Sequence, residues 1–355
     1  MSETQQKQAT TKVLVIRFSS MGDVILTSPV VRALHALLEG DVEVHFLTKV
    51  GFSEAVEGLP GIHRVWTIEK TTAEVEDGLR GVGFHYLVDL HANARSAFVK
   101  RALRKGEGRT LDLTVDKRSL DKILLVRTGW DRLAGQHVVE RYLETLRPFG
   151  QALERLAEAG DDGGLRLPVV ASPNAPAMGN GKRAVLALGA AHSGKAIPEL
   201  HWQQIVNGLL DTGHGVHLIG GPEEVALADR LVAEASHGTT ANRSLSNGVG
   251  DTWSDTFQSI QEAGVLIAGD TGAMHAGSAL QAPMVVVWGC TSPALGMGPW
   301  RAHADTVELE PTGPERGRPC SRLGDRCRHR TPCIQRVSPE RILNAALGLL
   351  SRTAP

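Results

Sequence analysis

An aspartate near the N-terminus, Asp23, is the first residue of this chain that could act as an acid or a base. It ends the small-residue loop 19–23, which follows the buried, strand-like run 13–18. A loop between a strand and a helix lies at the carboxyl edge of a parallel sheet, where such folds bind ligands. There Asp23 can be a general base, or a helix-start acid that the helix dipole favours. The local pattern supports the two roles equally.

Two loops in the second half of the chain place charged residues beside glycines. Lys195 comes shortly before a helix that is expected to begin after Pro198. A cation beside a helix N-terminus suits a phosphate, although Lys195 could also be an ordinary surface lysine. Glu223 and Glu224 follow the turn 220–222. Acids at this position can bind ribose hydroxyls, or can simply favour the first turn of a helix.

A third loop concentrates polar residues between the buried strand 265–268 and an Ala-rich helix. The backbone amides of Thr271 and Gly272, together with the Thr271 hydroxyl, can form an anion site. His275 lies about one turn further on and can face the same ligand. Asp270 can orient a hydroxyl or cap the helix. Because packing alone does not explain this cluster, we interpret it as a ligand-binding loop.

Several common motifs are absent from the sequence. No G-x-G-x-x-G motif follows the run 13–18, which disfavours a nicotinamide dehydrogenase, and no P-loop motif is found. The nucleophile elbow G-x-S-x-G is missing as well. The remaining interpretation is a protein that binds a nucleotide diphosphate in its second half and offers the Asp23 carboxylate from its first.

Strand-like runs alternate with helical patterns along both halves, which favours an α/β fold with parallel sheets. The stretch 168–182 is rich in Pro and Gly and marks a linker. We therefore predict two Rossmann-like domains that face a central cleft, and a closing helix that can pack back on the first domain. The predicted bounds are 1–170 for the N-terminal domain, 171–182 for the linker, 183–337 for the C-terminal domain and 338–355 for the closing helix.

Two local details of the pattern are informative. Ser28 is expected to cap a new helix with Pro29 at its first position, which would divide the first helical segment in two. Residues 110–135 are less regular, and the segment 137–149 is predicted to form an amphipathic helix.

The net charge and the hydropathy of the chain limit its possible partners and location. The chain has 355 residues and a formal net charge of −1, which argues against nucleic acid as a partner. Two basic runs, Arg95–Arg109 and Arg316–Arg330, make an anionic partner worth considering. The polar start of the chain is no secretory signal, and no run approaches the roughly 18 apolar residues of a membrane span. We expect a cytoplasmic protein that can rest on a membrane.

Three of the four cysteines lie near His329: Cys320 and Cys327 within the second basic run, and Cys333 just after it. Four such ligands could in principle hold zinc. The spacing lacks a C-x2-C pair, so free thiols or a local structural feature are favoured and no metal site is predicted.

Several segments together resemble the ADP-heptose:lipopolysaccharide heptosyltransferases of glycosyltransferase family 9. The resemblance covers nearly the whole chain, from Lys12 to about Leu350. The segments that carry it are SSMGDVILTSPVVRAL (19–34), DLHANARSA (89–97), HVVER (137–141), K-x-x-P-E-x-H-W (195–202) and IAGDTGAMHAGSALQAPMVVVWGCTSP (267–293). The resemblance implies a GT-B architecture, with the acceptor in the first Rossmann-like domain and the nucleotide sugar in the second.

The resemblance also implies roles for individual residues. Asp23 matches the general base that activates the acceptor hydroxyl. The residues that it implies on the donor side are Ser19, Ser20 and Gly22 in the loop near the donor, Lys195 at the diphosphate, Glu223 or Glu224 at the ribose, Asp270 near the donor sugar, and Thr271, Gly272 and His275 in the diphosphate-binding turn. Those implied on the acceptor side are Arg95, His137 and Arg141.

The function implied by the resemblance is inverting transfer of a heptose from ADP-heptose to the inner core of lipopolysaccharide. The acceptor would be lipid A–Kdo or an already heptosylated core. This acceptor is an anionic, lipid-linked sugar at the inner membrane, so the resemblance implies that the protein can contact that membrane peripherally. No cofactor is required on this reading, and Mg²⁺ is not indicated because the sequence has no D-x-D motif. The alternatives are a family 9 transferase that uses another nucleotide sugar, a nucleotide-sugar epimerase of the same architecture, and a binding protein that has kept the fold.

Overall fold

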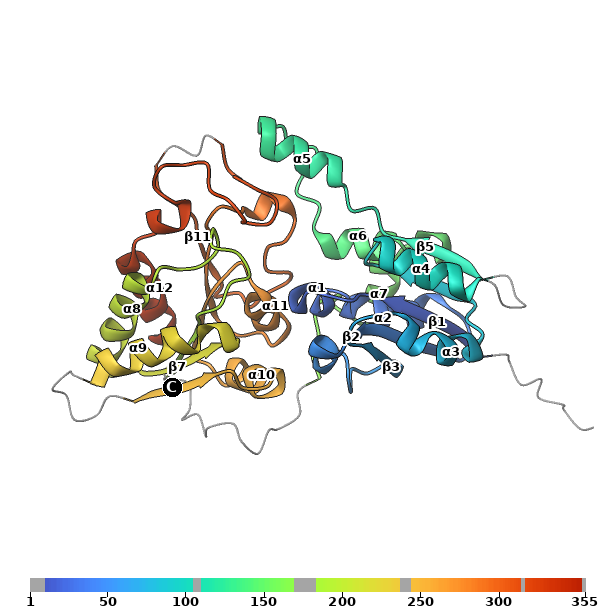
Figure 1. Cartoon of the computed structure of the whole chain (residues 1–355), viewed down its shortest axis with the longest axis horizontal. Helices are drawn as coiled ribbons and strands as arrows, with labels where there is room; N and C mark the ends of the chain where they lie inside the picture. The colour runs from blue at the N-terminus through green and yellow to red at the C-terminus, as the bar shows by residue number, and fades with distance from the viewer. Residues whose placement is uncertain (1–9, 105–109, 169–182, 237–243, 314–316, 353–355) are drawn as a thin grey trace, which may run out of the picture. The chain divides into compact units, whose positions relative to one another are not determined.

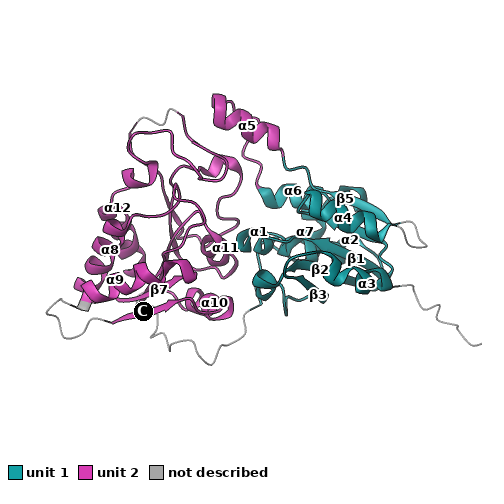
Figure 2. Cartoon of the chain, in the orientation of Figure 1, with its two compact units in different colours: residues 1–117, 138–168 teal, residues 118–137, 169–355 magenta. Residues whose placement is uncertain are grey.

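The computed structural model describes residues 10–104, 110–168, 183–236, 244–313 and 317–352. They form two compact α/β units, each built around one parallel sheet (Figures 1 and 2). Unit 1 comprises residues 1–117 and 138–168, and unit 2 comprises residues 118–137 and 169–355. The predicted α/β class with two Rossmann-like domains is confirmed. The predicted linker 171–182 lies outside the described residues.

The sheet of unit 1 has the strand order β3-β2-β1-β4-β5, and every neighbouring pair is parallel. Its strands are β1 (Thr11–Ile16), β2 (Val42–Lys49), β3 (Ile62–Ile68), β4 (Tyr86–Asp89) and β5 (Leu111–Thr114). The chain begins at β1, moves to one edge, and then returns to add β4 and β5 on the other side. The strand order therefore reverses between β1 and β4, which is where such sheets bind ligands.

Helices cover both faces of this sheet, so β1 is buried on both sides. Leu14 and Ile16 pack with Leu79 from α3 (Ala73–Val82) and with Val99 from α4 (Ala94–Leu103). Val13 points to the opposite face and is equally buried. The helical elements of unit 1 are α1 (Met21–Ile25), α2 (Ser28–Leu37), η1 (Val50–Ala55), α3 (Ala73–Val82), α4 (Ala94–Leu103), α6 (Val138–Glu144), η2 (Arg147–Phe149) and α7 (Ala152–Glu158).

The predicted division of the first helical segment is confirmed, with a change in detail. Helix α1 ends before α2 begins, and Pro29 stands in the first turn of α2. The N-cap position belongs to Thr27 and not to Ser28. The Ser28 hydroxyl instead accepts a hydrogen bond of 2.9 Å from the backbone N–H of Arg166.

The segment 110–135, irregular by its sequence pattern, contains both β5 and α5 (Ser119–Thr128). Helix α5 belongs to unit 2, although its sequence position lies within the predicted N-terminal domain. The physical reason is a small apolar cluster in which Leu125 and Leu133 pack against Leu295.

The sheet of unit 2 has the order β11-β10-β9-β6-β7-β8 and is also parallel throughout. Its strands are β6 (Arg183–Ala187), β7 (Gly215–Gly220), β8 (Leu245–Val249), β9 (Val265–Gly269), β10 (Met284–Val287) and β11 (Val307–Leu309). Its order reverses between β6 and β9, next to the first strand of the unit, as in unit 1.

The remaining helices complete unit 2. They are α8 (Glu199–Asp211), η3 (Pro222–Glu224), α9 (Val225–Ser236), α10 (Trp253–Gln261), α11 (Gly272–Ala279), η4 (Pro293–Leu295), η5 (Cys333–Arg336) and α12 (Pro339–Leu350). The closing helix α12 packs on α8, where Ile342 and Ala346 join the same core as Trp202 and Leu186. Its apolar face is therefore buried within unit 2, and its packing against the first domain stays a prediction. Among the described residues, no helix is both long and apolar enough to cross a membrane.

Candidate active site

The Asp23 carboxylate in unit 1 is contacted at both of its oxygens. The Nη2 atom of Arg17, the residue after β1, lies 2.8 Å from Asp23 Oδ1. Ser20 donates to Oδ2 from its hydroxyl at 2.9 Å and from its backbone N–H at 3.2 Å. The hydroxyl of Tyr142 on α6 lies 3.5 Å from Oδ1. The carboxylate is thus fixed beside the reversal of the sheet, with 21% of its side chain still exposed.

These contacts keep Asp23 ionised. Burial alone would raise the pKa of Asp23, but the charge of Arg17 and the hydrogen bonds from Ser20 outweigh burial and hold the pKa below its usual value. The pKa of Tyr142 moves the other way, because burial raises it. The phenol therefore stays protonated and can donate to the carboxylate.

The loop that carries Asp23 is arranged by the same arginine. The Ser19 carbonyl oxygen accepts a hydrogen bond of 2.9 Å from Arg17 Nε, and the Leu90 carbonyl oxygen accepts one of 2.6 Å from Arg17 Nη1. The peptide bond between Ser19 and Ser20 is cis, and Gly22 is buried in α1. Arg17 therefore connects the loops that follow β1 and β4.

A buried carboxylate, Asp89, ends β4 on the other side of the reversal. It is 1% exposed, accepts hydrogen bonds from the backbone N–H groups of His91 and Ala92, and pairs with Lys100 Nζ at 3.1 Å. Burial, helped by the charge of Arg17, lowers the pKa of His91 to about 4. The imidazole is therefore neutral at neutral pH, and Asp89 serves to shape the loop at the start of α4.

The three residues predicted to bind the acceptor are divided between the units. Arg95 is half-buried on α4, and Arg141 on α6 is buried at 4% exposure; both lie in unit 1. His137 lies in unit 2, where its Nε2 is 2.9 Å from the Gly298 carbonyl oxygen and its ring stacks on Trp300. The acceptor role of all three stays a prediction.

In unit 2, the loops after β6 and β9 meet in an ion pair. Lys195 Nζ lies 2.8 Å from Asp270 Oδ2, and the two side chains are 17% and 7% exposed. Because the strand order reverses between β6 and β9, this pair occupies the same topological position in unit 2 as Asp23 does in unit 1. Two residues that the sequence assigns to the donor side are thus brought together.

An unsatisfied hydroxyl lies directly beside this pair. Thr271 Oγ1 is buried and has no hydrogen-bond partner within the described ranges. Thr271 precedes α11, whose first N–H groups have no partners inside the helix. His275, 3% exposed, lies in the first turn of the same helix. A cation, a buried hydroxyl and helix N–H groups in one place can bind an oxyanion.

Of the two glutamates that follow β7, Glu224 is turned towards the loop after β6. Its Oε2 accepts a hydrogen bond of 2.8 Å from the Gly221 N–H, and a Cβ at Gly189 would lie 2.9 Å from the same oxygen. Burial raises the pKa of Glu224, whereas the Glu223 side chain is exposed. The position therefore favours Glu224 over Glu223, and the ribose role itself stays a prediction.

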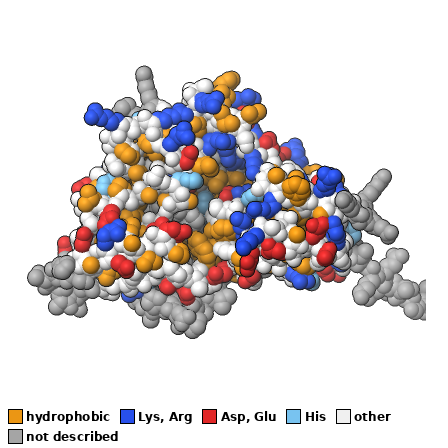
Figure 3. Space-filling view, in the orientation of Figure 1, with side chains coloured by type: hydrophobic (Ala, Val, Ile, Leu, Met, Phe, Trp, Pro, Cys, Tyr) orange, Lys and Arg blue, Asp and Glu red, His pale blue; other side chains and the backbone are white. Residues whose placement is uncertain are grey.

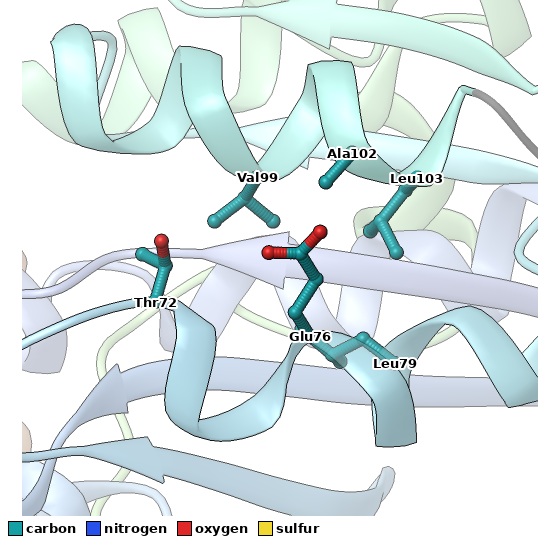
Figure 4. A pocket seen from close by; sticks show the side chains of 6 residues that line it. All are labelled: Thr72, Glu76, Leu79, Val99, Ala102 and Leu103. Atoms are coloured by element: carbon teal, nitrogen blue, oxygen red, sulfur yellow. The ribbon is translucent and has the colours of Figure 1, made fainter.

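A hollow between α3 and α4 of unit 1 is a separate feature (Figure 4). Its volume of about 10 Å³ is about what one water molecule needs, so it cannot hold a nucleotide. It is lined by Thr72, Glu76, Leu79, Val99, Ala102 and Leu103, none of which is a predicted site residue.

Two neighbours of Asp23, Arg17 and Tyr142, are missed by sequence reasoning. For Arg17 a signal was present, because a charged residue that continues a buried strand needs a buried partner. Tyr142 carries no such signal, since its spacing on α6 is that of an ordinary core residue.

Comparisons with known proteins identify the family of the chain. Residues 73–324 match the family model described as glycosyltransferase family 9 (heptosyltransferase). Lipopolysaccharide heptosyltransferase 1 of Pseudomonas aeruginosa is 25% identical over an alignment that covers 96% of this chain and 98% of that protein. A glycosyl transferase family 9 structure from Veillonella parvula has a TM-score of 0.72 at 17% identity and covers 96% of this chain and 98% of its own. The E. coli ADP-heptose lps heptosyltransferase II has a TM-score of 0.69 at 18% identity, covering 96% and 99%. The structural likenesses confirm the expected GT-B type of fold.

Proposed function

The chain belongs to glycosyltransferase family 9 and is a glycosyltransferase, and from this premise we propose that it transfers a heptose from ADP-heptose to the inner core of lipopolysaccharide. The acceptor is lipid A–Kdo or a core that already carries a heptose. The names of the relatives support the sugar and the acceptor. The observation that carries the mechanism is the ionised Asp23 carboxylate, fixed by Arg17 and Ser20 beside the reversal of its sheet.

In the proposed reaction, an acceptor hydroxyl attacks the anomeric carbon of the donor on the side opposite the diphosphate. Asp23 takes the hydroxyl proton as the new C–O bond forms, the bond from the anomeric carbon to the diphosphate oxygen breaks, and the configuration inverts. Because the hydroxyl becomes acidic only as it attacks, a carboxylate of lowered pKa is a sufficient base.

The departing diphosphate carries new negative charge, and unit 2 supplies the groups to stabilise it. Lys195 provides a cation, Thr271 and Gly272 provide backbone N–H groups, and His275 lies in the first turn of α11. Asp270 orients Lys195 and lies near the donor sugar. These groups provide the charge stabilisation from the protein itself, so the proposal needs no cofactor.

The test replaces Asp23 with Asn and measures transfer and nucleotide affinity separately. Transfer from ADP-heptose to deacylated lipopolysaccharide core, followed by mass spectrometry, should fall by about 10²- to 10⁴-fold, the usual size of a general-base effect. Affinity for ADP should stay the same. Asp77→Asn is the matched control, because the Asp77 side chain is fully exposed and its ion-pair partner is Arg80, which is not a predicted site residue. Transfer that persists within about tenfold in Asp23→Asn would contradict the assignment.

The same assay discriminates the alternatives for the donor. A panel of nucleotide sugars, each offered with the acceptor, should give product with ADP-heptose and little with the others. If another donor is preferred, the proposed transfer reaction still holds but the transferred sugar is not heptose. An altered nucleotide sugar in the absence of any acceptor would identify an epimerase instead.

We further infer a peripheral contact with an anionic membrane, and we propose helix α5 as its site in place of the basic run Arg95–Arg109. Within the basic run Arg95–Arg109, Lys100 pairs with Asp89 and Arg104 with Asp112, while residues 105–109 lie outside the described residues. Helix α5 is a better candidate, because hydrophobic and basic side chains lie next to one another over it (Figure 3). Leu120 is 81% exposed and Trp130, just after the helix, is 64% exposed. Apolar and basic groups together suit a membrane interface.

The contact is tested with the double variant Leu120→Ser/Trp130→Ser. The native protein should sediment with anionic phosphatidylglycerol vesicles at low salt and less so at high salt, and the variant should sediment weakly in both. Leu200→Ser is the control, since Leu200 is 69% exposed on α8. Vesicle binding that changes neither with salt concentration nor with the double substitution would contradict the inference.

A further inference from the structure

Unit 2 contains four cysteines whose thiols meet in one place, although they come from two distant parts of the sequence. Cys290 follows β10, whereas Cys320, Cys327 and Cys333 lie in the segment 318–333. The four Sγ atoms all lie within 4.8 Å of one another. Cys327 is half-buried and the other three are buried. These four are all the cysteines of the chain.

The distances between the sulfurs fit a shared metal ion and do not fit a covalent bond. Cys333 Sγ lies 3.6 Å from the Sγ atoms of both Cys320 and Cys327, which are 3.9 Å from each other. A disulfide would need about 2.05 Å. Thiolates at the corners of a tetrahedron with zinc–sulfur bonds of about 2.3 Å lie about 3.8 Å apart.

The cysteines form an apolar cluster separate from the main core of unit 2. Within the part of the chain that the structure describes, this cluster consists of the four cysteine side chains alone. Small thiols that pack on one another bury little apolar surface, so they are a weak core for the segment 318–333, which contains no strand and reaches helical structure only at Cys333. A metal ion bound by all four thiols would supply the missing attachment.

Backbone contacts bring the two parts of the chain together at this point. The Cys320 N–H donates to the Cys290 carbonyl at 2.7 Å, and the Cys290 N–H donates to the Gly194 carbonyl at 2.9 Å. A Cβ at Gly194 would lie 2.7 Å from Cys290 Sγ, which makes this a position for glycine. The Cys333 N–H points at Cys327 Sγ over 3.4 Å, the kind of N–H···S contact that supports a metal-bound thiolate.

We propose that Cys290, Cys320, Cys327 and Cys333 together bind one tetrahedral metal ion, zinc or iron. Four protein thiolates leave no open coordination position for a substrate, so the site is structural and not catalytic. This proposal replaces the interpretation of these residues as free thiols. The sequence spacing hides the site because the fourth ligand is Cys290, from the loop after β10, and not His329.

The bound metal fastens the segment 318–333 beside Lys195. The Gly194 N–H donates to the Gly324 carbonyl at 3.0 Å, and a Cβ at Gly324 would lie 2.6 Å from Lys195 Cγ. The segment therefore packs along the aliphatic stem of Lys195. Loss of the metal should weaken nucleotide binding without removing any nucleotide-binding group. This consequence rests on the proposed function, whereas the metal site does not.

The test is the metal content of the full chain, purified without a metal-affinity step from cells supplied with zinc and iron. Plasma mass spectrometry should find about one zinc or iron ion per native chain, and Cys327→Ser should lose most of it. Arg326→Ala is the matched control from the same segment, because the Arg326 side chain is 80% exposed, and it should keep the metal. Iron would colour the purified protein and zinc would not, which distinguishes the two ions.

A second measurement keeps the test decisive if the cysteine variants fail to fold. Native protein stripped with a chelator and given cobalt(II) should develop intense thiolate-to-cobalt absorption that saturates at about one equivalent. Its thiols should react slowly with a thiol reagent when metal is bound and quickly after chelation. The proposal is overturned if native protein carries no metal and shows no cobalt–thiolate absorption, or if folded Cys327→Ser keeps its metal undiminished.

Discussion

The two units share one sheet topology with an ion pair at the same place, but the groups around the two ion pairs differ. Each has a parallel sheet whose strand order reverses next to its first strand, and each places an ion pair on the loops at that reversal. In unit 1 the pair is Arg17 with Asp23, and in unit 2 it is Lys195 with Asp270. The separation is 2.8 Å in both pairs.

The difference lies in what surrounds each pair. In unit 1, Ser20 adds two further hydrogen bonds to the carboxylate, which fix its charge and position. In unit 2, the buried hydroxyl of Thr271 beside the pair has no partner among the described residues. Polar groups that hydrogen-bond to one another hold a charge in place. A buried polar group without a hydrogen-bond partner is instead typical of a site that binds a ligand. We infer that unit 1 is prepared for proton transfer and unit 2 for binding an anion.

The largest effect is expected from breaking the pair of unit 1 with Arg17→Met. This substitution leaves Asp23 without its cation, which should cost about 3 kcal/mol of stability, near the lower end for buried pairs because Asp23 is partly exposed. The pKa of Asp23 should rise, since burial then acts without the opposing charge. The acidic limb of the kcat profile should therefore move to higher pH than in the native enzyme.

The sign of the stability effect gives a second check on Arg17→Met. A carboxylate with a lowered pKa in the folded state stabilises the fold above its unfolded pKa of about 3.9, and this contribution disappears as the pH falls through the folded pKa. The stability difference between native protein and variant, measured by hydrogen exchange of β1 amides, should thus shrink as the pH falls below about 4. Arg17→Lys keeps a cation beside Asp23 and should therefore lose less stability than Arg17→Met. An unchanged kcat profile in Arg17→Met would show that the pair does not set the state of Asp23.

An intermediate effect is expected from Lys195→Met in unit 2. The substitution removes a charged hydrogen-bond donor from the proposed diphosphate site, worth about 1.5–3 kcal/mol, so ADP affinity measured by calorimetry should fall by about 10- to 150-fold. It also leaves Asp270 buried without its partner, which should lower the stability. Lys195→Met/Asp270→Asn removes that charge and should recover stability but not affinity. Recovery of both would mean that Lys195 acts on the fold and not on the nucleotide.

Local sequence features predicted much of this arrangement, and contacts between distant residues account for most of what was missed. The strand before Asp23, the break at Ser28 and the loop at Asp270 each follow from a few adjacent residues, and the structure has all three. Helix α5 was missed because only Leu125 among its side chains is buried, so its sequence has no clear apolar face. The short strands β8 and β11 carry weak local patterns, because LSNGV is mostly polar or glycine and VEL is only three residues long.

The same limit applies to the site. The contact of Ser20 with Asp23 is local and lies within the predicted loop. Tyr142 reaches Asp23 from far along the chain, and Cys290 reaches Cys320 in the same way. Such pairs depend on which strands become neighbours, and periodicity within one segment carries no information on that.

The smallest effect, and the sharpest test of the comparison, is expected from Thr271→Val. The substitution keeps the shape of the side chain and removes a buried hydroxyl that has no partner within the described ranges, so stability should stay the same or rise slightly. If the hydroxyl instead serves the nucleotide, ADP affinity should fall by about 2- to 13-fold, the equivalent of one ordinary hydrogen bond of about 0.5–1.5 kcal/mol. Thr48→Val is the matched control in unit 1, because Thr48 is fully buried and its hydroxyl also lacks a partner among the described residues. Equal losses of ADP affinity in the two variants would contradict the inference that unit 2, and not unit 1, binds the anion. A loss of affinity confined to Thr271→Val, at unchanged stability, would assign the anion to unit 2.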